Sequence, residues 1–327
     1  MNGSLIVLAR MLSVCSLMAY VGTATAQQDF PNKPIRIIVP YAPGISLDIM
    51  ARLIGPKITE RWGQQVIVDN RPGGNTIIGT EALMKSSPDG HTILLTTTTH
   101  VLNALLLATL PFDAIKDFAA VTSLATSELA LVVNPSLPAN DLREFIALAK
   151  TKPGQLNYGT NSAGGPTHLA GVLLGIRADI KLQDVPYKGS AAVMTDLIGG
   201  RVQLSFQPPI SIAPHIKAGR LKALAISGER RWPPMPQVPT FTEAGLPGFD
   251  MKYWFGILAP VGTPKAIVEK LSIELGRVMN LPDVEESLRA QGIDVFVSTP
   301  EKFAEFMKAD LARYTEIVKA ADIKIKN

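Results

Sequence analysis

Short apolar runs alternate with longer amphipathic stretches along this chain. The first apolar run covers residues 35–39, an amphipathic stretch follows at 47–61, and a second apolar run lies at 65–68. This alternation is typical of strands and helices that build a parallel sheet. The same pattern predicts helices at 79–85, 142–151, from 166 onward, 191–198, 264–280, 282–291 and 300–321, and strands at 91–96, 129–133, 155–158, 184–185, 202–206, 221–227 and 253–260. We therefore expect an α/β fold.

Proline and glycine mark the breaks between these elements. Turns are predicted at 72–74 and 88–90, where the chain reads PGG and PDG. Residues 139–141 precede the helix predicted at 142–151 and are expected to cap it. The stretch 232–239 contains four prolines, which lack a backbone donor and fix their own φ, so we expect a loop there.

The first 26 residues have the composition of a targeting segment. Arg10 precedes an apolar run at 11–21, and small residues follow at 24–26, so we expect removal of residues 1–26 and a mature protein in the periplasm. The apolar run is shorter than the roughly 20 residues that a transmembrane helix needs.

The rest of the chain exceeds the usual size of one domain, so we expect two lobes. One lobe is predicted to combine 27–128 with 251–327, and the other to span 129–250.

Cys15 is the single cysteine and lies in the targeting segment, which leaves no disulfide and no thiol nucleophile in the exported form. A lipoprotein signal has a small residue directly before its cysteine, whereas this chain has Val14 there, so we do not expect lipid attachment at Cys15. The net charge of +4 is spread along the chain, unlike the clustered charge of a nucleic-acid binder, so we expect no nucleic-acid partner.

Two predicted strand-to-helix loops have the chemistry of anion sites. The loop at 40–48 joins the first strand to the first helix, where free backbone N–H groups and the positive end of the helix dipole point outward. The alternative is an ordinary turn in which Asp48 caps the helix or pairs with Arg52. The loop at 157–168 repeats this architecture with Gly, Ser and Asn residues. Two such loops suggest one ligand held between the lobes.

Further hydroxyl groups follow the strand predicted at 91–96, where the chain reads TTTTH at 96–100. Open α/β sheets bind ligands at this edge. His100 and His168 could each donate to a carboxylate, or each could serve the structure by capping a helix or bonding a buried carbonyl. For His168 we favour the structural role.

Catalytic and metal-binding signals are weak. Ser162 lacks the glycine two residues before it that a nucleophile elbow needs. The four histidines include no pair at helical i,i+4 spacing, and the phosphate-binding glycine fingerprints are missing from the sequence. We therefore expect no enzyme activity, no metal and no cofactor. Two alternatives stay open, an exported hydrolase or isomerase that uses Ser162, and a module that senses a ligand for a membrane signalling partner.

The chain resembles the Bug (TctC-like) family of extracytoplasmic solute receptors that serve tripartite tricarboxylate transporters. The resemblance runs from about Phe30 to the C-terminus. It rests on PNKPIRIIVPYAPG (31–44), VDNRPGG (68–74), PDGHT (88–92), LNYG (156–159), HLAG (168–171), VPYKGS (185–190), PHIKAGRLKALA (214–225), VPT (238–240), EAGLPG (243–248) and WFG (254–256).

The resemblance implies a type II periplasmic-binding-protein fold, with two lobes of mixed, mostly parallel sheets and a ligand cleft between them. It implies a small organic carboxylate as ligand, membrane transporter subunits as partners, and a monomer. The two loops would hold the carboxylate. The expected ligand-binding residues are Tyr41, Pro43, Gly44, Ile45, Ser46, Asp48, Thr98, His100, Thr160, Asn161, Ser162, Ala163, Gly164, Gly165, His168, Tyr187 and Gln207.

This sequence departs from the family pattern at three of these positions and at Leu47 beside them. Ile45 stands where the family usually has glycine, Leu47 where it often has a small hydroxyl residue, and Gly165 where it often has serine. Gln207 occupies a place often held by Asp or Asn. Ile45 and Leu47 put larger apolar side chains into the loop, and Gly165 offers no side-chain hydrogen-bond donor. We therefore expect a carboxylate with an apolar or aromatic body rather than citrate or an amino acid.

Overall fold

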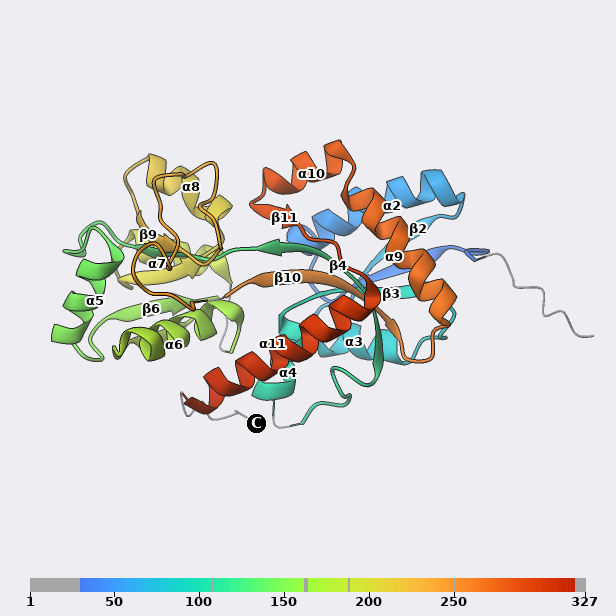
Figure 1. The fold of residues 1–327 in the computed structure, drawn as a ribbon, viewed down its shortest axis with the longest axis horizontal. Coiled ribbons are helices and arrows are strands. Elements are labelled where there is room, and N and C mark those ends of the chain that lie inside the picture. The colour runs from blue at the N-terminus through green and yellow to red at the C-terminus, as the bar shows by residue number, and fades with distance from the viewer. Residues whose placement is uncertain (1–29, 108, 162–163, 188, 250, 321–327) are drawn as a thin grey trace, which may run out of the picture. The chain divides into compact units, whose positions relative to one another are not determined.

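A computed structural model describes residues 30–320, except for 108, 162–163, 188 and 250 (Figure 1). The chain divides into two compact units, Met1–Asn32 and Lys33–Asn327. Every helix and strand described below lies in the second unit. The predicted targeting segment at 1–26 lies outside the described residues.

The first sheet has six strands in the order β11-β4-β10-β3-β1-β2. Strand β1 pairs in parallel with β2 and β3, whereas β10 runs antiparallel between β3 and β4. The strands are β1 (Ile35–Val39), β2 (Val66–Asn70), β3 (Thr92–Thr97), β4 (Phe118–Ser127), β10 (Tyr253–Pro260) and β11 (Ile293–Val295).

The second sheet has five strands in the order β7-β6-β8-β5-β9. Strand β6 pairs in parallel with β7 and β8, and β5 runs antiparallel to β8 and β9. The strands are β5 (Ala130–Val133), β6 (Asn157–Thr160), β7 (Gln183–Pro186), β8 (Leu204–Gln207) and β9 (Lys222–Ile226). Both sheets are thus mixed.

Helices cover the two sheets (Figure 1). They are α2 (Ser46–Trp62), the 3-10 turn η1 (Gly74–Thr76), α3 (Ile77–Met84), α4 (Thr99–Leu106), α5 (Leu142–Thr151), α6 (Pro166–Ala178), α7 (Ser190–Ile198), α8 (Pro209–Lys217), α9 (Lys265–Met279), α10 (Pro282–Arg289) and α11 (Pro300–Ala320). The predicted cap of α5 is confirmed, because the Asp141 carboxylate accepts a hydrogen bond of 2.7 Å from the Glu144 N–H.

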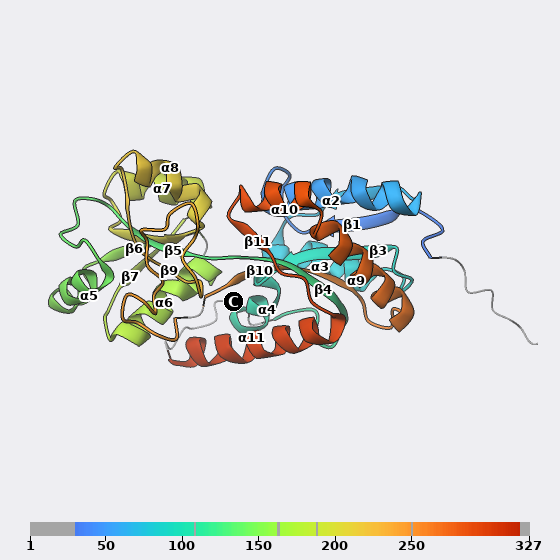
Figure 2. The ribbon, with the colours of Figure 1, turned by 45° about the horizontal axis from the view of Figure 1, so that its top comes forward.

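The chain crosses between the sheets where β4 leads into β5 and again where the segment after β9 leads into β10 (Figure 2). The Ser227 hydroxyl joins these crossings. Its Oγ accepts from the Leu129 N–H at 2.9 Å and donates to the Met251 carbonyl at 2.8 Å. One buried side chain therefore connects the two crossings between the sheets.

The centre of the first sheet packs against α11. Trp254 on β10 is fully buried and meets the Phe303 ring edge-to-face, with ring centroids 5.4 Å apart. The Trp254 indole N–H donates to Asp310 at 2.8 Å, which satisfies the polar edge of the ring. A Cβ on Gly256 would lie 2.2 Å from the Phe303 ring, so only glycine fits there.

The predicted α/β class is confirmed, and most predicted elements are present with ends that agree or are shifted by at most two residues. The sequence analysis did not include β4, α4, α8 or β11. Strand β4 is rich in Ala, Ser and Thr. It lies between β11 and β10, and most of its successive residues are buried, so its sequence lacks a clear apolar alternation. Helix α4 begins directly after β3, where the four threonines suggested only the end of a strand. The Pro-rich stretch 232–239 is outside the helices and strands, as predicted.

Candidate functional site

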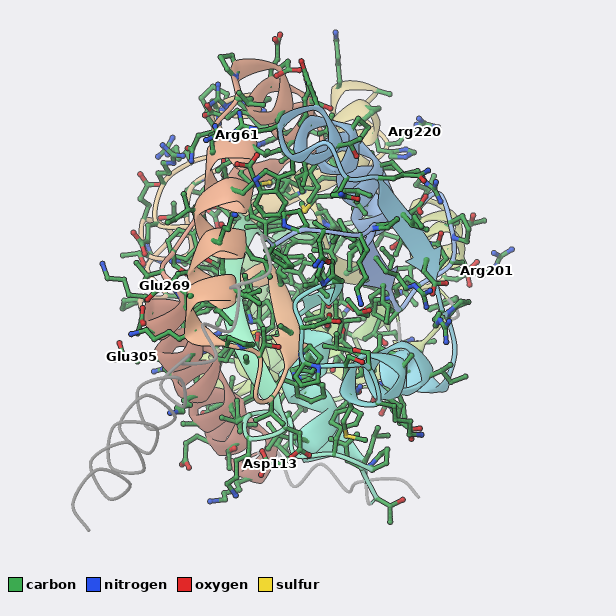
Figure 3. The ribbon with its side chains drawn as sticks, turned by 90° about the vertical axis from the view of Figure 1, so that its right-hand side faces the viewer. Arg61, Asp113, Arg201, Arg220, Glu269 and Glu305 are labelled. Carbon is green, nitrogen blue, oxygen red and sulfur yellow. The ribbon has the colours of Figure 1, made fainter. Side chains whose placement is uncertain are left out.

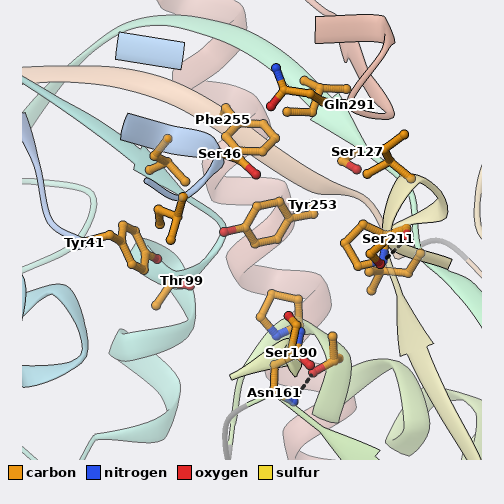
Figure 4. Close-up of a pocket in the computed structure, with 18 of the residues that line it drawn as sticks. Tyr41, Ser46, Thr99, Ser127, Asn161, Ser190, Ser211, Tyr253, Phe255 and Gln291 are labelled. Carbon is orange, nitrogen blue, oxygen red and sulfur yellow. Dashed lines mark hydrogen bonds between the residues drawn. The ribbon is translucent and has the colours of Figure 1, made fainter. Parts of the chain in front are cut away.

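A cavity of about 510 Å³ opens between loops of the two sheets, and we call it the cleft cavity (Figure 4). It collects residues from the segments that follow β1, β2, β3, β6, β7 and β8, together with residues of β10 and β11 and of the β4–β5 crossing. The residues that line it are Tyr41, Ile45, Ser46, Leu47, Asn75, Thr99, Ser127, Leu129, Asn161, Pro166, Thr167, Ser190, Pro208, Ile210, Ser211, Tyr253, Phe255, Gln291 and Ile293.

None of these described lining residues carries a charged side chain. Exposed charged groups lie at the periphery, where Figure 3 shows Arg61, Arg201 and Glu269 pointing away from the ribbon. The described cavity wall offers hydroxyl and amide groups beside aliphatic and aromatic surface. Such a site binds an anion through neutral hydrogen-bond donors rather than through an ion pair.

The loop between β1 and α2 brings three of the expected ligand-binding residues, Tyr41, Ile45 and Ser46, to the cavity. Asp48 does not line it. The Asp48 carboxylate accepts from the Gly44 N–H at 2.9 Å and forms an ion pair of 3.0 Å with Arg52. Hydrogen bonding from Arg52 lowers the pKa of Asp48, with smaller contributions from Gly44 and Asn70. The predicted alternative of an i,i+4 partner for Arg52 is therefore what the structure contains.

Hydroxyl groups gather on the same side of the cavity. The Tyr41 hydroxyl lies 3.1 Å from Thr97 Oγ1, and Thr99 and Tyr253 belong to the same group. Figure 4 shows the Tyr253 ring across the middle of the cavity with its hydroxyl toward Tyr41. Burial raises the pKa of both phenols, so both keep their protons and can donate.

The loop between β6 and α6 brings Asn161 to the cavity. Its Oδ1 accepts from Gln207 Nε2 at 3.0 Å, and the same Nε2 donates to Ser205 Oγ at 2.8 Å. Ser205 Oγ gives its own hydrogen to the Gly159 carbonyl at 2.7 Å, so it must accept from Gln207. This order of donors fixes both amides and leaves the Nδ2 group of Asn161 for a ligand. Gln207 itself is fully buried and acts behind Asn161.

His100 and His168 both have structural partners. His100 is buried between Phe112 and Phe118 and bonds through Nε2 to the Ala114 carbonyl at 2.8 Å. Burial lowers the pKa of His100 to about 4. His168 Nδ1 accepts from the Gly164 N–H at 2.9 Å, which holds the loop before α6.

Other expected site residues also lie behind the cavity wall. Thr98 Oγ1 accepts from the Trp254 N–H at 3.0 Å, and Tyr187 donates to Asp196 at 2.7 Å. Pro43, Gly44, Thr160, Gly164 and Gly165 are outside the lining set, and Thr160 is fully buried. Ser162 and Ala163 lie outside the described residues.

Several lining residues were not predicted, notably Asn75, Ser127, Tyr253, Phe255 and Gln291. Tyr253 and Phe255 had a usable signal, because alternate residues of a strand share one face and the strand at 253–260 was predicted. Gln291 follows α10 and reaches the cavity only through the pairing of β11 with β4.

Within the described residues, we find no cluster of three or more His, Cys, Asp or Glu side chains that could hold a metal ion. The described helices include none that is long and apolar enough to cross a membrane.

Comparison with known proteins gives three consistent findings. A family model described as tripartite tricarboxylate transporter family receptor matches residues 50–323. The "UPF0065 protein in tcbD-tcbE intergenic region" of Pseudomonas sp. (strain P51) is 37% identical over 312 residues, which cover 94% of this chain and 93% of that protein.

Two solved structures from Rhodopseudomonas palustris are also similar. Rpa4515 with adipate is 32% identical, covers 90% of this chain and 99% of its own, and has a TM-score of 0.79. MatC with bound malate is 29% identical, covers 88% and 100%, and has a TM-score of 0.75. The two-lobed fold of solute-binding proteins is therefore confirmed for this chain, and the similar proteins are binding proteins rather than enzymes.

Proposed function

This chain belongs to the tripartite tricarboxylate transporter receptor family, and from that premise we propose that it delivers a small carboxylate with an apolar or aromatic body to a membrane transporter. The single observation that carries the proposal is the chemistry of the cleft cavity. Neutral donors from loops of both sheets face a space whose other wall is apolar.

The carboxylate end would be held by groups such as Ser46, Thr99 and Asn161. A hydrogen bond to an ionised carboxylate is about twice as strong as one between neutral groups, so a few such donors in a buried site suffice. Adipate and malate, the ligands of two similar receptors, are both carboxylates. The ligands of these two similar proteins support a carboxylate as the ligand class of this chain.

The apolar end would contact Phe255, Ile293, Leu129 and Ile210, which line the cavity near the β4–β5 crossing. Ile45 and Leu47 add apolar surface at positions where the family pattern has glycine or a small hydroxyl residue. This surface favours a ligand body without further charges, since a second carboxylate placed there would lose its hydration without gaining partners.

The proposal includes export to the periplasm with removal of residues 1–26, action as a monomer, and closure of two lobes over the ligand. We assign the lobes to 27–128 with 251–327 and to 129–250. The division of strands supports this assignment, because β5 to β9 form one sheet and the remaining strands form the other. Tyr41, Ile45, Ser46 and Asn161 are the expected site residues that we assign to direct ligand contact.

The test begins with the protein exported from its own leader and purified without added ligand. Mass spectrometry of the denatured protein identifies any molecule carried through purification, and calorimetric titration compares benzoate, phenylacetate, adipate, citrate and glutamate. We expect one aromatic or long-chain carboxylate to bind at a 1:1 ratio without product formation, and citrate and glutamate to bind weakly. Tight binding of citrate and glutamate with none of benzoate or phenylacetate contradicts the proposed ligand class.

The hydrolase alternative is tested in the same samples. If the protein is a receptor, neither the wild type nor Ser162→Ala forms a product from a bound ester or amide. Turnover of an ester or amide that disappears in this variant contradicts the receptor proposal.

A further inference from the structure

The loop between β2 and α3 has an unusual backbone. Four consecutive residues have positive φ, with values of 118° at Gly73, 56° at Gly74, 51° at Asn75 and 78° at Thr76. Two of these are not glycine, and threonine is β-branched, so this conformation is strained. Such strain persists only where the surroundings determine it, and it gathers at functional sites.

Asn103 on α4 determines this conformation. Its side chain is fully buried, and its Nδ2 donates to the Asn75 carbonyl at 2.7 Å and to Thr76 Oγ1 at 3.1 Å. Its Oδ1 accepts from Asn75 Nδ2 at 2.6 Å. Because a backbone carbonyl can only accept, the orientation of the Asn103 amide is unambiguous. Asn75 must therefore turn its Nδ2 toward Asn103.

Asn75 lines the cleft cavity, whereas Asn103 does not. With one Nδ2 hydrogen engaged by Asn103, the second hydrogen and Oδ1 of Asn75 are the groups left for a ligand. The opposite loop uses the same arrangement, since buried Gln207 fixes the amide of cavity-lining Asn161 at 3.0 Å. In each case a buried amide orients a more accessible amide at the cavity wall.

We propose that Asn75 donates a hydrogen bond to the polar group of the bound carboxylate, and that Asn103 is the positioning residue that aims it. This inference rests on the proposed receptor function and names a contact that the strand-to-helix loops at 40–48 and 157–168 do not supply. The β2–α3 loop becomes a third binding loop, and its strained backbone is the means by which the Asn75 amide reaches the cavity. Prior fixing of the amide lowers the entropy lost on binding.

The first experiment compares Asn75→Gly with Asp179→Gly. Both residues have left-handed backbones, with φ of 51° and 52°, which glycine adopts freely. Asp179 ends α6, is exposed and lies outside the cavity lining, so it is a matched control. We titrate adipate and benzoate calorimetrically into each protein. We expect both variants to fold, Asn75→Gly to lose at least about tenfold in affinity, and Asp179→Gly to stay within about twofold of the wild type.

The second experiment tests the positioning role through a double-mutant cycle. Asn103→Asp keeps the size of the side chain but replaces Nδ2 by an oxygen that cannot donate to the Asn75 carbonyl. We expect it to weaken binding in the wild-type background and to have little further effect in the Asn75→Gly background. Equal losses of affinity in both backgrounds overturn the positioning role, because a general structural effect would not depend on Asn75. If Asn103→Asp fails to fold, the comparison of Asn75→Gly with Asp179→Gly alone decides whether Asn75 contacts the ligand.

Wild-type affinity of Asn75→Gly for both probes overturns the inference while leaving the receptor function intact. If the wild-type protein binds none of the carboxylates, the receptor proposal fails and the inference fails with it. The two failures are therefore distinguished by the wild-type titration.

Discussion

The carboxylate of Asp48 accepts a hydrogen bond of 2.9 Å from the backbone N–H of Gly44. The β1–α2 loop was expected to offer its N–H groups to a bound anion, but the N–H of Gly44 already donates to the carboxylate of Asp48. Asp48 is 3% exposed and also receives hydrogen bonds from Arg52 and Asn70. A ligand carboxylate at the Gly44 N–H would meet a like charge, so this N–H is not available to it.

Replacement of Asp48 by alanine should destabilise the fold. Asp48→Ala removes the acceptor for Gly44, Arg52 and Asn70 together, and we expect the free energy of unfolding to fall by about 1–3 kcal/mol. Urea denaturation measures the change. Glu285→Ala is the control, because Glu285 forms only an exposed i,i+4 pair with Arg289 and its loss should change stability little. Equal effects of the two substitutions would contradict an anchoring role for Asp48.

Ile45 shows a conflict between stability and binding. It is the N-cap of α2, has no side-chain capping hydrogen bond, and is 38% exposed in the cavity wall. Isoleucine is among the worst N-cap residues, and serine is among the best. The choice of isoleucine makes sense if its side chain contacts the apolar body of the ligand.

Ile45→Ser should therefore stabilise the protein and weaken binding. We expect a gain of about 0.5–2 kcal/mol from the new cap and a loss of about tenfold in affinity for benzoate, since several buried CH₂ equivalents are removed. Thermal unfolding and calorimetry measure the two effects. Ile45→Val is the control, because it keeps an apolar contact and adds no cap. Unchanged benzoate affinity in Ile45→Ser would remove Ile45 from the site.

The fold was predictable where local signals agree with the tertiary structure. Helix α5 combines an apolar face with the Asp141 cap, and β10 is an apolar run that ends at Pro260, so both were predicted with correct ends. Strand β4 was missed because its buried polar residues bond to distant partners. Thr122 and Ser123 make hydrogen bonds to Ser298, which lies about 175 residues later in the chain.

Some residues of the candidate site were likewise predictable from the local sequence, and others were not. Ser46 and Asn161 were predictable because each lies in a loop that directly follows a strand of a parallel pair. Asn75 was not, because the GGN sequence at 73–75 indicates only a turn, and the role of that turn depends on Asn103 in another helix. The cavity-lining role of Gln291 likewise depends on which strands become neighbours, and no local pattern encodes this.

His100 should make the protein sensitive to mild acid. Burial lowers its pKa from 6.5 to about 4, so the folded state keeps the ring neutral where the unfolded state binds a proton. The stabilising contribution is present above pH 6.5 and is lost as the pH falls toward 4, with a total of about 3 kcal/mol. His100→Gln can still donate to the Ala114 carbonyl and does not titrate. We expect its unfolding free energy to fall less than that of the wild type between pH 7 and 4.5, and parallel curves would contradict this assignment.

Glu128, at the β4–β5 crossing, should have the opposite effect on how stability depends on pH. Its carboxyl packs so closely on Gly228 that a Cβ there would lie 1.8 Å from Oε1. Burial raises the pKa of Glu128 to about 7, the negative charges of Asp294 and Glu229 add to the increase, and Arg230 and Lys252 oppose it. Between pH 4.5 and 7 the folded state therefore binds more protons than the unfolded state. The contribution of Glu128 to stability is complete below pH 4.5 and is lost as the pH rises through 7.

Glu128→Gln replaces the protonated carboxyl by a neutral group of the same shape. We expect the variant and the wild type to have similar unfolding free energies near pH 4.5, and the variant to be more stable by about 1–3 kcal/mol at pH 8. Urea denaturation at a series of pH values measures the difference. Glu301→Gln is the control, because Glu301 is exposed, lies near Lys265, has a lowered pKa, and is not among the groups that shift the pKa of Glu128. A constant difference between Glu128→Gln and the wild type across pH 5–8 would show that Glu128 is ionised throughout, and that the negative charge is tolerated at the crossing.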